Sequence, residues 1–187
     1  MSKQTFKVLV LGPPNVGKTS LVQRYTQGVF EENYNPTIGF DVSTEELVFP
    51  EGEIKLAIMD LGGQESFDDL RRRLFQGTHY VIIVYDLTDP STFSEIPTWY
   101  ETLCNEVCLP TGVFLPGSIV ANKADLAKRV DTERGKQMAK LLNLDYFEAS
   151  AKSGKNVSEI FARAASQCHV RAFGVKDDTT TELIMRP

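Results

Sequence analysis

The chain has 187 residues, of which 42% are hydrophobic and 24% charged, and its formal net charge is −5. These values are typical of one globular domain with its own core, and the acidic balance argues against nucleic acid or an anionic membrane surface as a partner. Its three cysteines form no paired framework, and we recognise neither a signal peptide nor an apolar stretch of membrane-spanning length, so we expect a cytoplasmic protein.

Short segments that read as β-strands occur at six places along the chain. Three of them are continuously apolar, as expected for parallel strands that are covered on both faces. Two others are joined by the turn 50–52 (PEG), which predicts an antiparallel hairpin at one edge of the sheet. The six segments lie at residues 8–11, 40–49, 54–58, 81–85, 118–121 and 146–149.

Between the strands, apolar residues recur with the three- and four-residue spacing of helices. Ser91, Asp131 and Asn156 are the predicted N-caps of these helices. The helical segments lie at residues 96–108, 131–142 and 157–168, and the side chains predicted to face inward on the second are Met138, Leu141 and Leu142. Strands that alternate with helices predict an α/β fold in which a mostly parallel sheet carries helices on both faces.

Residues 12–19 (GPPNVGKT) match the phosphate-binding pattern G-x-x-x-x-G-K-[ST] and stand between a predicted strand and a predicted helix. In such a loop, backbone N–H groups and the helix N-terminus attract phosphates. Lys18 supplies a positive charge for the β- and γ-phosphates, and the Thr19 hydroxyl is a suitable Mg²⁺ ligand. Pro13 and Pro14 lack an N–H, so the donors must follow them. The predicted nucleotide contacts here are Asn15, Val16, Gly17, Lys18, Thr19 and Ser20.

The tetrapeptide NKAD, which begins at Asn122, directly follows a predicted strand. Asp125 can accept hydrogen bonds from the ring imino group and the exocyclic amine of guanine, a pattern that adenine lacks. Lys123 can lie along the base plane, and Asn122 can join this loop to the phosphate loop. After a later strand, the segment 150–152 (SAK) places the Ala151 N–H where it can donate to the guanine carbonyl oxygen. The predicted base contacts are Asn122, Lys123, Asp125, Ser150, Ala151 and Lys152.

Two loops carry residues suited to sensing a third phosphate. Asp60 ends a predicted strand and can hold Mg²⁺ through water, while the Gly63 N–H can reach the γ-phosphate. Gln64 can orient the attacking water, which makes it the predicted catalytic residue. Thr37 can ligate Mg²⁺ only while the γ-phosphate holds its loop closed, so hydrolysis would relax both loops. The predicted metal ligands are therefore Thr19, Thr37 and, through water, Asp60.

With these motifs in this order, residues 5–172 resemble the small GTPases of the Ras superfamily. The resemblance implies a three-layer P-loop fold with a six-stranded sheet in the order 2-3-1-4-5-6, whose one antiparallel strand lies at an edge. It implies GTP and GDP as ligands together with Mg²⁺, and GTP hydrolysis that is slow without an activating protein. It also implies that Phe30 stacks on the base, that Tyr34 closes over the phosphates, and that switch loops at about 30–40 and 60–76 contact effectors, exchange factors and activating proteins.

Within the superfamily the sequence is most similar to the Rab branch, through the segments 36–39 (PTIG), 85–88 (YDLT) and 148–152 (EASAK). This similarity suggests a role in membrane trafficking or signal transduction. The departures from the Rab pattern are at Val42, Met59, Leu61 and Gly62, so effector specificity is not carried over. Pro14 narrows the space beside the γ-phosphate, and we expect it to change how an activating arginine fits.

The end of the sequence differs from that of most relatives. Cys168 is the last cysteine, so no C-a-a-X box is present, and Ser2 stands where N-myristoylation requires glycine. We therefore expect no direct lipid anchor, membrane association through partners alone, and a monomer. No linker divides the chain, which predicts a GTPase domain over residues 1–172 and a polar tail over 173–187.

Two other functions stay open at this point. A GTP-binding interaction module with negligible hydrolysis is kept open by Pro14 and by the altered Leu61 and Gly62. A nucleotide or small-molecule kinase could use the same phosphate loop, but the NKAD and SAK segments argue against it. Cys104 and Cys108 are spaced like a pair of metal ligands on a helix, yet their place on the apolar stripe favours buried free cysteines.

Overall fold

The computed structural model describes residues 4–32, 37–62, 73–107, 109 and 113–175 of the chain. Its strands are β1 (Gln4–Leu11), β2 (Phe40–Phe49), β3 (Gly52–Leu61), β4 (Tyr80–Asp86), β5 (Gly117–Asn122) and β6 (Asp145–Glu148). Its helices are α1 (Lys18–Gln27), α3 (Pro90–Ser94), α4 (Ile96–Val107), α5 (Thr132–Leu142) and α6 (Val157–Phe173). In this part of the chain, no helix combines the length and the apolar character needed to cross a membrane.

The six strands form one sheet in the order β2-β3-β1-β4-β5-β6. β1 pairs in parallel with β3 and β4, and the pairs β4–β5 and β5–β6 are also parallel. β2 pairs antiparallel with β3 through the predicted turn, in a register that places Phe49 opposite Gly52. The structure therefore confirms the predicted α/β fold, its strand order and its antiparallel edge strand.

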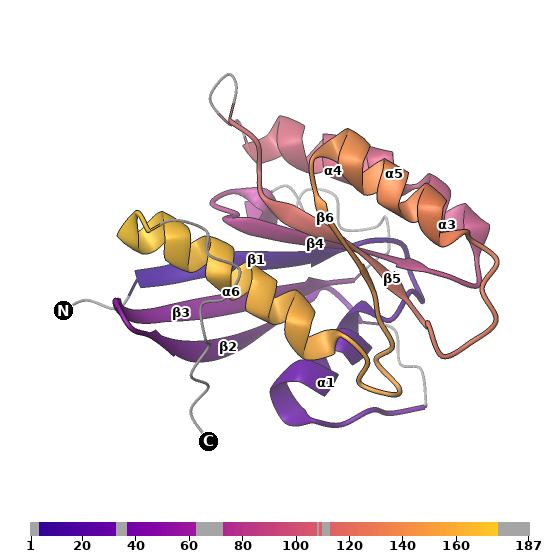
Figure 1. Cartoon of the computed structure of the whole chain (residues 1–187), viewed down its shortest axis with the longest axis horizontal. Coiled ribbons are helices and arrows are strands. Elements are labelled where there is room, and N and C mark those ends of the chain that lie inside the picture. Colours follow the sequence, from indigo (N-terminus) through magenta and orange to yellow (C-terminus); the bar gives the residue numbers. More distant parts are fainter. Residues whose placement is uncertain (1–3, 33–36, 63–72, 108, 110–112, 176–187) are drawn as a thin grey trace.

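The two faces of the sheet are covered by different helices, and Figure 1 shows the resulting three layers. α1 and α6 cover one face, where Val8 and Val10 of β1 join the first core cluster. α3, α4 and α5 cover the other face, where Leu9 and Leu11 of the same strand join the second cluster. Successive side chains of a strand point to opposite faces, so a strand buried on both sides must be apolar throughout.

The parallel arrangement also decides where the predicted motifs meet. The carboxyl ends of β1, β3, β4, β5 and β6 lie at the same edge of the sheet. The phosphate loop follows β1, Asp60 lies near the end of β3, and Asn122 is the last residue of β5. In open α/β sheets, ligands bind outside this carboxyl edge.

Two local predictions were wrong, and a third was right in position only. Asp89, not Ser91, is the N-cap of α3: the Asp89 Oδ1 accepts the Ser91 N–H at 3.0 Å, since a carboxylate two residues before that N–H reaches it. Asn156 stands at the N-cap position of α6 without capping it, because its side chain donates to the Glu148 carbonyl instead. Leu141 is 78% exposed, because it stands about 200° around the helix from the buried Ala139.

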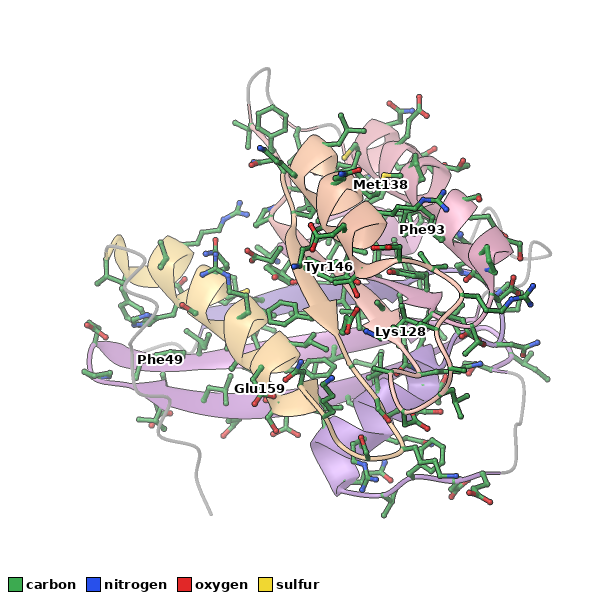
Figure 2. The ribbon with its side chains drawn as sticks, turned by 45° about the vertical axis from the view of Figure 1, so that its right-hand side comes forward. Phe49, Phe93, Lys128, Met138, Tyr146 and Glu159 are labelled. Atoms are coloured by element: carbon green, nitrogen blue, oxygen red, sulfur yellow. The ribbon has the colours of Figure 1, made fainter. Side chains whose placement is uncertain are left out.

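α5 packs on the sheet through a face that sequence spacing did not identify in full. Gly135 and Ala139 are its buried residues, while Met138 and Leu142 pack beside them against the second cluster. A Cβ at Gly135 would lie 2.5 Å from the ring of Tyr146, which belongs to β6. The glycine therefore allows this ring to pack directly against α5 (Figure 2). The predicted N-cap Asp131 is confirmed, since its Oδ1 accepts the Glu133 N–H at 2.7 Å.

Candidate nucleotide-binding site

A cavity of about 460 Å³ opens at the carboxyl edge of the sheet. It is lined by residues from every motif singled out in the sequence, although those motifs are far apart along the chain. The predicted contacts that line it are Asn15, Gly17, Lys18, Thr19, Ser20, Phe30, Thr37, Asn122, Lys123, Asp125, Ala151 and Lys152. Val16, Asp60 and Ser150 are buried, and each is hydrogen-bonded to a residue of this lining. Tyr34, Gly63 and Gln64 lie outside the described residues.

The phosphate loop curls around the ammonium group of Lys18. This side chain is only 6% exposed, and its Nζ donates to the carbonyls of Gly12 at 2.8 Å and Pro13 at 2.7 Å. Gly12 has a φ of +137°, and a Cβ at that position would lie 2.2 Å from the Val84 carbonyl oxygen, so only glycine fits there. The loop leads directly into α1, which begins at Lys18. Its shape places backbone N–H groups and a helix N-terminus at one end of the cavity.

Oxygen atoms of three predicted metal ligands converge beside that loop. The hydroxyls of Thr19 and Thr37 are 2.7 Å apart, and the Thr19 hydroxyl donates to the Asp60 Oδ2. The Asp60 Oδ1 is buried, and no described residue forms a hydrogen bond with it. Burial raises the pKa of the Asp60 carboxyl, while the Thr19 hydroxyl and the Lys18 charge oppose that rise. Two hydroxyls and a carboxylate with a spare buried oxygen fit Mg²⁺, which prefers hard oxygen ligands.

Asn122 joins the base-recognition loops to the phosphate loop, as the sequence predicted. Its side chain is almost fully buried, and its Nδ2 donates to the Val16 carbonyl at 2.8 Å. Its Oδ1 accepts the Ala151 N–H at 3.2 Å. The Ser150 hydroxyl donates to the Asp125 Oδ1 at 2.6 Å, which fixes the carboxylate predicted to read guanine. Three stretches of chain, the phosphate loop, the NKAD segment and the SAK segment, are thus connected around one end of the cavity.

Sequence reasoning missed two carboxylates that support these loops. Asp86 ends β4 and lies 2.6 Å from the Lys123 ammonium. Glu148 ends β6 and lies 2.6 Å from the Lys128 ammonium, which belongs to the loop after Asp125 and is labelled in Figure 2. Both carboxylates stand at the carboxyl end of a strand predicted to be parallel. Because ligands bind outside these strand ends, that position could have indicated their place beside the site.

The loop that carries Thr37 lies close against the end of β3. The Gly62 N–H donates to the Gly39 carbonyl at 2.9 Å. A Cβ at Gly62 would lie 2.3 Å from the Thr37 carbonyl oxygen. The missing side chain at position 62, one of the departures from the Rab pattern, therefore permits this close contact between the two predicted switch segments.

Only one cysteine of the predicted pair lies in the part of the chain that the structure describes. Cys104 is a free cysteine that packs beside the second core cluster, and Cys108 lies outside the described residues. Within the part of the chain that the structure describes, no group of three or more histidine, cysteine or acidic side chains is arranged to hold a metal ion. The cluster of Thr19, Thr37 and Asp60 falls outside that criterion, because two of its three oxygen donors are hydroxyl groups.

Comparison with known proteins agrees with the fold. The Ras family model matches residues 7–170. The chain is 33% identical to the Ras-related protein Rab7 of Drosophila melanogaster over 180 residues, which cover 94% of this chain and 87% of that protein. It is 36% identical to the Ras-related protein Rab-7L1 of Rattus norvegicus over 157 residues (82% and 77% of the two chains). It is 32% identical to the Ras-related protein RabC of Dictyostelium discoideum over 160 residues (83% and 80%). The chain therefore belongs to the Ras family of small GTPases, which bind GTP and GDP, and it is a divergent, Rab-like member.

Proposed function

We propose that this protein is a molecular switch that binds GTP or GDP with Mg²⁺ and hydrolyses GTP slowly in the absence of an activating protein. The observation that carries the proposal is the convergence of Thr19, Thr37 and Asp60 next to the buried Lys18. One cavity thereby combines a phosphate cradle with hard oxygen ligands and guanine-specific loops. We propose that residues 1–172 form the GTPase domain and residues 173–187 a tail.

Each part of the cavity has a separate task in this proposal. The N–H groups of Asn15 to Thr19 bind the phosphates, and Lys18 neutralises charge on the β- and γ-phosphates. Bound Mg²⁺ would be held by Thr19, Thr37 and, through water, Asp60, and it would neutralise the charge that develops on the phosphate oxygens. Asp125 and Ala151 select guanine, with Phe30 stacked on the base.

The chemical step is assigned to Gln64. A glutamine side chain can both accept a hydrogen bond from the attacking water and donate one, so it can orient that water in line with the bond to be broken. The reaction transfers the γ-phosphoryl group to water and releases phosphate, which leaves GDP bound. Thr37 then loses the γ-phosphate that favours its closed position, and the switch loops at about 30–40 and 60–76 change the surface that effectors contact.

The same proposal extends to partners and location. Exchange factors, activating proteins and effectors are expected as for other small GTPases, while nucleic acid is not expected. We propose that the protein is a cytoplasmic monomer that reaches membranes through partners, in trafficking or signal transduction.

A module that binds GTP without hydrolysing it is the second candidate, because Pro14 lines the cavity where an activating arginine would enter. Single-turnover phosphate release separates the two functions, with the Gln64→Leu variant as the matched reference. We expect the wild type to release phosphate faster than the variant, and equal rates would support the non-hydrolysing module. Pro14→Gly tests the arginine hypothesis, since it should change the turnover stimulated by an activating protein.

A further inference from the structure

Arg24 lies in the last turn of α1 and connects three backbone carbonyls. Its Nε donates to the Ala151 carbonyl at 2.8 Å, and its Nη1 donates to the Gly28 carbonyl at 2.9 Å. Its Nη2 donates to the Lys152 carbonyl. In return, the Gly28 N–H donates to the Arg24 carbonyl at 3.2 Å. One side chain thus links the end of α1 to a loop more than 120 residues further along.

The two segments that Arg24 links border the same cavity. Ala151 and Lys152 belong to the loop predicted to read guanine, and Gly28 begins the loop that carries Phe30. Phe30 itself packs against the first core cluster while lining the cavity. The base is therefore expected between two loops whose spacing depends on one guanidinium.

The chemistry of this position favours arginine over any other residue. A guanidinium offers five N–H donors in a rigid planar fork and has no acceptor, so it can serve several carbonyls at once. The negative end of a helix dipole also favours a cation in the last turn. Lysine carries the same charge on a flexible stem, but its single nitrogen cannot reproduce the fork.

The Ala151 residue is held at both of its backbone polar groups. Its N–H donates to Asn122 Oδ1 at 3.2 Å, and its carbonyl accepts from Arg24. A bound base would have to take over the N–H from Asn122, whereas the bond from Arg24 to the carbonyl can stay in place and hold the backbone of Ala151. Loss of the bond from Arg24 would leave only the long contact to Asn122.

We propose that Arg24 is a positioning residue for guanine recognition, which holds the Ala151 N–H at the depth where it can donate to the base carbonyl oxygen, O6. The inference rests on the proposed function, since it assigns Arg24 a role in the guanine site described there. Arg24 does not touch the base in this assignment; it acts through the Ala151 and Lys152 backbone and through the loop that begins at Gly28.

Three nucleotides distinguish this role from a general structural one. GDP offers both the O6 and the exocyclic amine, inosine diphosphate lacks the amine, and 6-thio-GDP replaces O6 by a weakly accepting sulfur. We expect Arg24→Lys to speed the dissociation of GDP and of inosine diphosphate by the same factor, about tenfold or more, since a lost hydrogen bond is worth about that much in affinity. The factor for 6-thio-GDP should be smaller, because that nucleotide has little O6 contact to lose.

The controls make each outcome decisive. Arg163 does not line the cavity, and its Nε donates to the Asp145 Oδ2 at 2.6 Å. Arg163→Lys should therefore leave all three dissociation rates unchanged. Arg24→Gln provides a second variant, which should also accelerate the dissociation of GDP by a larger factor than that of 6-thio-GDP. Equal acceleration for all three nucleotides, or no acceleration, would overturn the role of Arg24. Failure of the wild type to prefer GDP over ADP would instead overturn the proposed function.

Discussion

The Lys123 ammonium lies 2.6 Å from the Asp86 Oδ2, which joins the loop after β5 to the end of β4. The other carboxylate oxygen, Oδ1, accepts the Thr88 N–H and hydroxyl, both at 2.7 Å. Lys123 also has a φ of +65°, a backbone conformation that non-glycine residues seldom adopt. The carboxylate therefore holds both the direction of the Lys123 side chain and the turn that follows β4.

Replacing Asp86 with asparagine tests the first of these two roles. The amide oxygen can still accept from Thr88, while the amide nitrogen can no longer attract the Lys123 ammonium. We expect GDP to dissociate about 5- to 30-fold faster, because the Lys123 stem loses its fixed place along the base and a partly buried charged hydrogen bond is worth about 1–2 kcal/mol. Dissociation of a fluorescent GDP analogue measures this effect.

A double-mutant cycle with Lys123→Met shows whether Asp86 acts through the lysine. Methionine keeps the apolar stem and removes the charge, so Asp86→Asn should have no further effect in that background. Asp145→Asn removes a carboxylate oxygen 2.6 Å from Arg163, which is remote from the cavity, and should leave dissociation unchanged. Additive effects of the two substitutions at 86 and 123 would contradict the assignment.

Asn122 allows a second prediction, because its side chain serves two partners from a nearly water-free position. Asn122→Ala leaves the Val16 carbonyl and the Ala151 N–H without their partner. We expect the free energy of unfolding to fall by about 1–3 kcal/mol, measured by urea denaturation at fixed GDP and Mg²⁺ concentrations. Asn122→Asp keeps the acceptor for Ala151 and loses the donor to Val16, so its loss of nucleotide affinity and stability should differ from that of the alanine variant.

How much of the site can be predicted from the sequence depends on how far apart the interacting residues lie along the chain. The phosphate loop, Asn122 and Asp125 were found because each motif has a fixed local spacing and a strand before it, and parallel strands then bring those motifs to one edge. Arg24 and Asp86 were missed because their partners lie elsewhere in the chain: Arg24 and Ala151 are 127 positions apart. Only the folded structure brings such residues together.

The same limit applies to packing within a single helix. The three- and four-residue spacing identified Met138 and Leu142 as inward-facing, but it also admitted Leu141, which is exposed. The buried face of α5 is set by Gly135, whose missing side chain lets the Tyr146 ring approach. A glycine carries no apolar signal, so a pattern based on hydrophobic residues cannot reveal that the helix turns this side toward the sheet.

Gly62 leads to a third prediction, on switching. An alanine Cβ at this position would lie 2.3 Å from the Thr37 carbonyl oxygen, so the Thr37 loop would have to move away from β3. Thr37 is the ligand expected only when a γ-phosphate is bound. We therefore expect Gly62→Ala to weaken the binding of a non-hydrolysable GTP analogue by about tenfold and to change GDP affinity much less. Titration of both nucleotides into the same protein provides the internal control, and equal losses would contradict the prediction.

A fourth prediction concerns acid stability and rests on His79, which directly precedes β4 and bonds to the backbone of β1. The Nδ1 of His79 accepts the Lys7 N–H at 3.0 Å, and the ring packs edge-on against Phe6. Burial, together with the charges of Arg171 and Lys7, lowers the pKa of His79 below its ordinary value. Protonation also destroys the acceptor that the Lys7 N–H requires.

A histidine with a lowered pKa in the folded state binds its proton more tightly when the chain unfolds. The stability it contributes is therefore complete above about pH 6.5, the pKa of an unfolded histidine, and is lost as the pH falls from there toward the lower folded-state pKa. His79→Asn keeps an acceptor oxygen in the place of Nδ1 and cannot titrate in this range. We expect the variant to show a shallower fall in unfolding free energy between about pH 6.5 and 5.

Urea denaturation at several pH values measures the two slopes. Every other side chain is the same in the two proteins, so the comparison isolates position 79. Parallel slopes for the wild type and His79→Asn would show that the folded state does not disfavour the protonated His79. A steeper slope for the wild type would show that the contact with the Lys7 N–H depends on the neutral ring.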